Sequence, residues 1–297
     1  MKKRVFAFLV CFVMVFMMFP SIVHADAGPK PSVVINFKGL EGEKYYVTLL
    51  SETKSTGPYS AYSEKSRPPR YTQEDEEYDI WNKFVSYKDA DGYYFLQFFR
   101  DCSEDARFAW TYYPPAEFKV LLYFPEKDSF LASDGTFERY AFDSYYTAYA
   151  DGGIEPGESR VGGIRIEKSY DFKWEMLSLF ARIAATIAIE AAIALLFGFR
   201  TRKQMHVILI ANIITQSLLN ILLNIVNYNL GWMMFVLGYI VLEILVFAAE
   251  AVAYRIFINK YGDKKFSNIR IVSYAFVANL ASFFIGLGIA RIIPGIF

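Results

Sequence analysis

The chain has 297 residues, of which 54% are hydrophobic and 18% aromatic, an apolar fraction above the norm for soluble proteins. Its net charge of zero hides an acidic and a basic half, because residues 26–175 carry 27 acidic and 18 basic side chains whereas residues 176–297 carry 4 and 10. The basic side chains of the second half lie in short loops between apolar runs, which excludes a nucleic-acid-binding surface, so we expect no nucleic-acid partner.

Residues 1–25 have the three parts of a secretory signal peptide. A basic start is followed by an apolar run at residues 5–19 and by a small-residue cleavage site at 23–25. The run is short for a membrane span, so we predict a signal peptide that is cleaved; an uncleaved anchor is the alternative. Cleavage would remove Cys11 and leave Cys102 as the single thiol, so we expect no disulfide.

Residues 26–150 predict a mostly-β extracellular domain. Segments rich in β-branched and aromatic residues predict strands at 32–37, 45–50, 93–99, 107–112, 118–124 and 136–142. Between the second and third strands, residues 53–70 predict a long exposed loop, and apolar residues at helical spacing predict one short helix over 74–87. This pattern of short strands favours a small antiparallel sandwich.

Two features of this domain have a functional and a structural interpretation. Asp89-Ala-Asp91-Gly92 is a fragment of a Ca²⁺ loop, and a plain Asp-Gly turn is the alternative. Paired aromatics such as Tyr145-Tyr146 place one ring on each face of a strand. The outward rings either bind a ligand or simply cover the domain. The Gly-rich residues 151–172 that follow predict a stalk or linker.

Residues 173–297 predict an α-helical transmembrane domain of four spans. The apolar runs are 22–24 residues long and lie at about 176–199, 205–228, 232–253 and 271–293. The loops at 200–204 and 254–270 are basic, whereas the link between the second and third runs carries no charge. The positive-inside rule therefore places both basic loops in the cytoplasm, with residues 26–172 and the C-terminus outside a plasma membrane.

Polar side chains recur at helical spacing within these spans. A step of four residues drifts only about 40° around a helix, so such side chains share one face. The candidate site residues are Arg182, Glu190, Asn212, Gln216, Asn220, Glu243, Glu250 and Asn279. Amides often join membrane helices to each other, which is the structural interpretation. Carboxylates inside a span are costly, which favours a functional one.

Histidine and cysteine are too scarce for a zinc site, since the histidines are His24 and His206. We therefore expect no cofactor, and a Na⁺, Mg²⁺ or Ca²⁺ ion held by carboxylates such as Glu243 and Glu250 is the open alternative. The run from Glu250 to Arg255 resembles half of the Glu-Glu-x-x-x-Arg motif of CPBP-type intramembrane proteases. Ala251 replaces its second Glu and the later His motifs are absent from the sequence, so this assignment is set aside.

The second half resembles uncharacterised bacterial multi-pass membrane proteins. The shared features are an Asn-x-x-Thr run, here 212–215, a Glu-bearing span with Glu243 and Glu250, and an Ala-Asn-x-x-Ser run, here 278–282. The resemblance implies a multi-pass membrane protein and no particular activity.

Two functions from different classes follow. The first is a binding or sensing protein, in which the exported domain recognises an envelope component or a membrane-protein partner and the polar-cored bundle anchors it. The alternative is a small transport-like or intramembrane catalytic bundle that uses its buried carboxylates. Four spans are few for a transporter, so this alternative requires a homo-oligomer.

Overall fold

The computed structural model describes residues 28–63, 70–150, 153–170 and 172–292. The signal peptide predicted for residues 1–25 lies outside these ranges. The chain divides into a β-rich unit, Lys30–Tyr170, and a helical unit that comprises Met1–Pro29 and Asp171–Phe297. Each unit has its own core and is described by itself.

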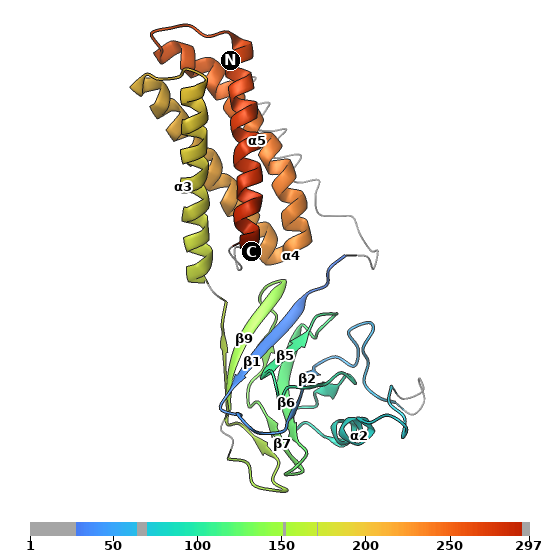
Figure 1. The fold of residues 1–297 in the computed structure, drawn as a ribbon. Coiled ribbons are helices and arrows are strands. Elements are labelled where there is room, and N and C mark those ends of the chain that lie inside the picture. The colour runs from blue at the N-terminus through green and yellow to red at the C-terminus, as the bar shows by residue number, and fades with distance from the viewer. Residues whose placement is uncertain (1–27, 64–69, 151–152, 171, 293–297) are drawn as a thin grey trace. The chain divides into compact units, whose positions relative to one another are not determined.

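The first sheet of the β-rich unit has four strands in the order β11-β9-β1-β5 (Figure 1). Their bounds are β1 Ser32–Lys38, β5 Arg107–Trp110, β9 Asp143–Ala150 and β11 Ile164–Lys168. Strand β1 lies between β5, to which it is antiparallel, and β9, to which it is parallel. The sheet is therefore mixed.

The second sheet has seven strands, of which five follow the order β10-β7-β6-β2-β3. Its central strands are β6 (Glu117–Phe124) and β2 (Tyr46–Ser51), which pair antiparallel over the whole of β2. The shorter strands are β3 Tyr94–Phe95, β4 Arg100–Asp101, β7 Ser129–Ala132, β8 Phe137–Glu138 and β10 Arg160–Val161. Strand β10 pairs parallel with β7, so this sheet is mixed as well.

The second sheet is covered on both faces. One face packs against the first sheet through a core that includes Val33, Trp110 and Leu122. The other face is covered by α2 (Tyr78–Ser86), whose Trp81 and Phe84 pack on the sheet. This double covering explains why seven of the eight residues of β6 are buried, a pattern that strict in-and-out alternation does not produce.

Several predicted elements are confirmed in place. Strands β1, β2 and β6 and helix α2 lie within or next to their predicted ranges. The expected antiparallel sandwich is corrected to two mixed sheets. Only β3 forms within the strand predicted at 93–99, because Gln97 adopts φ 62°, outside the extended region.

The segment expected to be a linker, residues 151–172, contains β10 and β11. Strand β11 pairs antiparallel with β9 over five residue pairs, from Ile164 opposite Ala150 to Lys168 opposite Tyr146. The adjacent glycines, Gly162 and Gly163, both have positive φ, 92° and 83°, a conformation suited to glycine. They form the turn between the two strands rather than part of a flexible stalk.

The helical unit contains three long helices within the described residues: α3 (Phe172–Leu196), α4 (Arg202–Tyr261) and α5 (Asn268–Ile292). By length and composition, each is apolar enough to cross a membrane. Their exposed side chains are dominated by Leu, Ile, Val and Phe, as expected for a surface in contact with lipid.

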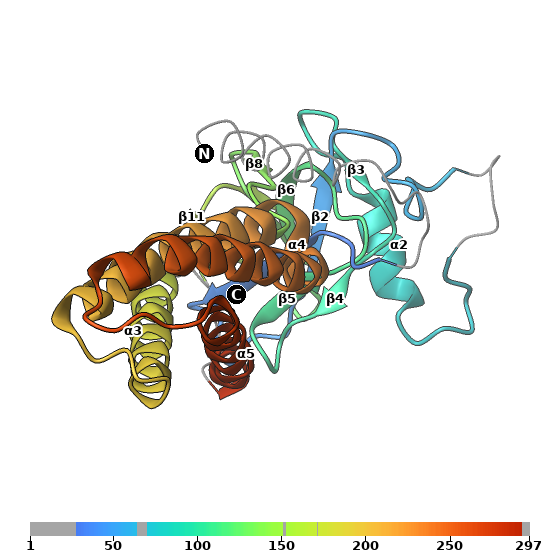
Figure 2. The same cartoon turned by 90° about the horizontal axis from the view of Figure 1, so that it is seen from above.

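Helix α4 reverses direction at Gly231, where φ is 79° and ψ is 177°. Three contacts show that its two halves are antiparallel, because successive residues of the first half contact residues that lie earlier and earlier in the second half. They are Gln204 Nε2 to Ile258 O at 3.3 Å, Asn212 Nδ2 to Tyr254 OH at 3.0 Å, and Thr215 Oγ1 to Glu250 Oε1 at 2.6 Å. We call residues 202–230 the first arm and residues 232–261 the second arm (Figure 1; Figure 2).

Candidate functional sites

The structure buries all eight polar side chains that the sequence singled out within the helical unit. Their exposed fractions lie between 0% and 8%: Arg182, Glu190, Asn212, Gln216, Asn220, Glu243, Glu250 and Asn279. They come from α3, both arms of α4, and α5. Helical spacing therefore identified an interior face correctly, and the functional role of that face stays a prediction.

Glu190 and Asn212 join α3 to the first arm of α4. The Asn212 Nδ2 group donates to Glu190 Oε2 at 2.7 Å and lies 3.0 Å from the hydroxyl of Tyr254 on the second arm. From α5, the Tyr274 hydroxyl donates to the backbone oxygen of Glu190 at 3.3 Å. Side chains from all the long helical segments therefore converge on Glu190.

Glu250 joins the second arm to the first arm and to α5. Thr215 donates to its Oε1 at 2.6 Å, and Asn279 Nδ2 donates to its Oε2 at 2.7 Å. Tyr254 follows Glu250 by one helical turn and lies beside both Glu190 and Glu250. We call Glu190, Asn212, Thr215, Glu250, Tyr254 and Asn279 the carboxylate cluster.

Arg182 lies at a different level of the unit. Its guanidinium carbon is 5.4 Å from the centroid of the Tyr239 ring, a cation–π geometry. Tyr239 precedes Glu243 by one helical turn, so the Arg182 guanidinium lies at the level of Glu243 within the helical unit. On the first arm, Asn220 donates to the carbonyl of Gln216 at 2.8 Å, a bond within its own helix.

Sequence reasoning missed the roles of Tyr254 and Tyr274. Tyr254 lies four residues after Glu250, a spacing that places both on one helix face, and this signal could have identified it. Tyr274 carries no comparable signal, because its partner is a backbone oxygen 84 residues away. Among the described residues, no group of three or more His, Cys, Asp or Glu side chains is placed to hold a metal ion.

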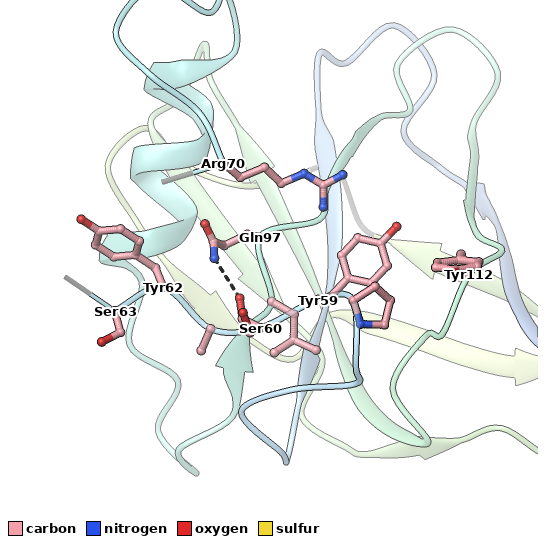
Figure 3. Close-up of a pocket in the computed structure, with 10 residues that line it drawn as sticks. Tyr59, Ser60, Tyr62, Ser63, Arg70, Gln97 and Tyr112 are labelled. Carbon is pink, nitrogen blue, oxygen red and sulfur yellow. Dashed lines mark hydrogen bonds between the residues drawn. The ribbon is translucent and has the colours of Figure 1, made fainter. Parts of the chain in front are cut away.

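The β-rich unit contains a cleft of about 350 Å³ (Figure 3). Its lining includes Tyr59, Tyr62, Arg70, Gln97 and Tyr112. The Arg70 guanidinium carbon is 5.1 Å from the centroid of the Tyr59 ring. Most of the lining comes from the segment predicted as an exposed loop, and the sequence did not single out this site.

Gln97 is held in place within this cleft. Its φ of 62° is unusual for a residue other than glycine. Its Nε2 donates to Ser60 O at 2.9 Å, as the dashed line in Figure 3 shows. Its Oε1 is buried and has no hydrogen-bond partner among the described residues. Backbone strain combined with an unsatisfied acceptor is a feature of ligand-binding positions.

A second cleft, of about 700 Å³, shares residues 60–63 with the first. Its lining adds Lys54, Lys88 and Tyr94, and the Lys54 ammonium is 5.4 Å from the Tyr94 ring centroid. The described lining of the two clefts contains three basic residues and no acidic one. This local positive charge stands out in an acidic unit.

The carboxylates of the Asp-Gly turn at residues 89–92 pair with a lysine from another part of the chain. Asp89 Oδ2 accepts from the backbone N–H groups of Asp91 and Tyr93 at 3.0 and 3.2 Å. The Lys119 ammonium pairs with both Asp89 and Asp91, and the Lys119 and Asp89 side chains are only 3% and 2% exposed. The carboxylates thus have a cation from the protein itself, which favours the structural interpretation over a Ca²⁺ loop.

No protein-family model, curated protein or solved structure matches the chain. The clefts and the carboxylate cluster are therefore the features of the described residues that bear on function.

Proposed function

We propose that the chain is a multi-pass plasma-membrane protein whose exported β-rich unit binds an anionic carbohydrate of the cell envelope. In this account the helical unit is the anchor. The single observation that carries the proposal is the basic, aromatic cleft organised around Gln97.

The reversal of α4 supports this membrane topology. Its two arms match the second and third predicted spans, so α3, the two arms and α5 supply four crossings. Four crossings place both basic loops, residues 200–204 and 254–270, on one side of the membrane. The positive-inside rule assigns that side to the cytoplasm, and the β-rich unit to the outside.

The ligand class follows from the side chains of the clefts. Tyrosine rings offer flat apolar faces with polar edges, which suit sugar rings. Arg70 offers paired donors for a carboxylate or phosphate. Lys54 and Lys88 continue the positive charge along the adjoining cleft, which suits a polymer better than a small ligand.

A glycan array with matched anionic and neutral envelope polysaccharides tests this proposal on the purified full-length protein. Arg70→Gln should weaken binding of the anionic glycans at least about tenfold, the loss of roughly 1.4 kcal/mol. Arg165→Gln is the matched control, because its guanidinium also lies over a tyrosine ring, at 4.7 Å from the Tyr149 centroid, and its side chain is 70% exposed on β11. Equal binding of neutral and anionic glycans, or unchanged binding by Arg70→Gln, contradicts the proposal.

The transport-like or catalytic alternative is favoured by one observation, the burial of three glutamates among described residues that include one buried arginine, Arg182, which lies near Glu243 and away from Glu190 and Glu250. It concerns the helical unit alone and is compatible with ligand binding outside. A homo-oligomer remains part of that alternative.

A further inference from the structure

We infer that the carboxylate cluster binds a monovalent cation, a proton or Na⁺, within the helical bundle. This inference concerns the helical unit and does not depend on ligand binding by the β-rich unit.

The buried carboxylates of the cluster lack a cationic partner among the described residues. Glu190 and Glu250 are completely buried, with an exposed fraction of 0% each. Their side-chain hydrogen-bond partners are neutral amide and hydroxyl groups, those of Asn212, Thr215, Tyr254 and Asn279. Within the described part of the chain, neither carboxylate forms a salt bridge. A buried carboxylate without a cation is costly, so a bound positive charge stabilises the folded bundle.

The cluster also has a surplus of hydrogen-bond acceptors. Glu190 Oε1, Asn212 Oδ1 and Asn279 Oδ1 are buried and have no donor among the described residues. A buried acceptor without a donor destabilises the folded state. A cation interacts favourably with such oxygen atoms, and a bound proton turns a carboxylate oxygen into a donor. The unsatisfied groups are thus all of the kind that a cation satisfies.

The free oxygen atoms of the cluster suit a monovalent rather than a divalent cation. Ca²⁺ takes six to eight oxygen ligands with several carboxylates, and Mg²⁺ demands near-octahedral geometry. Here the unsatisfied oxygens of the cluster are one carboxylate oxygen and two amide oxygens. Three free oxygens are fewer than the ligands that Ca²⁺ or octahedral Mg²⁺ takes, and they suit Na⁺ or a proton better.

Two clefts reach the cluster from different helix pairs. One, of about 310 Å³, lies between α3 and the first arm and is lined by Asn212 and His206. The other, of about 190 Å³, lies between the second arm and α5 and is lined by Glu243 and Asn279. The cluster is therefore bordered by a cleft on each of two helix pairs. Any pH response includes the other charged or titratable groups of these helices, which are Arg182, Arg200, Arg202, His206, Tyr239, Glu243, Tyr254 and Tyr274.

The test is the thermal stability of the purified full-length protein in detergent. NaCl is exchanged for choline chloride at constant ionic strength, at several pH values. If the cation is Na⁺, the melting temperature rises with sodium by roughly 5 °C or more at saturation. If it is a proton, the melting temperature rises as the pH falls and is independent of sodium. Glu190→Gln and Glu250→Gln should each abolish the sodium response or, if the cation is a proton, leave only the smaller pH dependence that the other groups contribute.

Asn220→Ala is the control, because it removes a buried polar side chain of the same unit that lies outside the cluster and its two clefts, and it should retain the response. If a Gln variant fails to fold, Glu190→Asp replaces it. This variant keeps the negative charge but, because its side chain is shorter, moves the carboxylate oxygens away from the cluster. The midpoint of the sodium or pH response should therefore move at least tenfold in ion concentration. A wild-type protein indifferent to both sodium and pH overturns the inference. So does a response that is undiminished in Glu190→Gln and Glu250→Gln, or an unmoved midpoint in Glu190→Asp.

Discussion

Removal of the segment that the sequence predicted as a linker should strongly destabilise the β-rich unit. A fragment of residues 30–170 contains both sheets complete, whereas a fragment of residues 27–152 lacks β10 and β11. The missing segment includes two buried side chains, Ile154 and Ile164, that are 6% and 5% exposed in the core between the sheets. It also covers the hydrogen-bonding edge of β9.

The size of the effect follows from this burial. Complete burial of an isoleucine side chain contributes about 1.5–3 kcal/mol, so loss of the two should cost roughly 3–6 kcal/mol. Domains of this kind have unfolding free energies of about 5–15 kcal/mol. The shorter fragment should therefore be marginal or unfolded, and the longer one should unfold cooperatively.

Urea denaturation followed by tryptophan fluorescence measures the difference. Trp110 lies in the core between the sheets and Trp81 lies on α2, in the core between that helix and the second sheet, so single-tryptophan variants report on the two cores separately. The core around Trp110 should lose stability directly, because the two isoleucines belong to it. Unfolding free energies that agree within about 1 kcal/mol for the two fragments would refute the assignment of β11 as an integral strand.

Three further predictions concern single residues. Lys119→Met should lower the free energy of unfolding in urea by about 3 kcal/mol, because it leaves the Asp89 carboxylate buried without its cation. Asp91→Asn should lower it by less than about 1 kcal/mol, because the Asp91 side chain is 66% exposed. Equal losses in the two variants would contradict this. Burial raises the pKa of the Cys102 thiol to about 12, so Ellman's reagent at pH 8 should label the unfolded protein and not the folded one. Since the unfolded thiol ionises near pH 8.5, its contribution to stability should be lost above that pH. Gly231→Ala should lower the melting temperature of the full-length protein, at a cost of about 1–3 kcal/mol, because the φ of 79° and ψ of 177° at this position suit glycine. Gly238→Ala is the control, because a Cβ added there would meet only ordinary contacts at 3.8 Å or more. A similar loss in both variants would contradict the assigned turn.

The sequence predicts well those features that depend on local periodicity. The buried face of the helical unit is of this kind, because steps of four and seven residues fix one side of a helix. Strand β6 was also found, from its run of β-branched and aromatic residues. The prediction needed no knowledge of what lies opposite.

Features that depend on distant partners could not be predicted. Strand β11 is recognisable only through β9, because its glycine-rich surroundings also suit a flexible linker. The pairing of Thr215 with Glu250 requires the reversal of α4. The cleft around Gln97 requires a strained backbone next to a loop that contacts it through Ser60, and composition carries no signal for that geometry.

The central claim, an exported β-rich unit on a four-span anchor, is tested most directly by topology reporters in intact cells. Fusions to a reporter active only in the cytoplasm should be active at Gln204 and Asp263, within or next to the basic loops. A reporter active only outside the cytoplasm should be active after Phe297. Activity of the cytoplasmic reporter at the C-terminus would mean an odd number of crossings and would contradict the account.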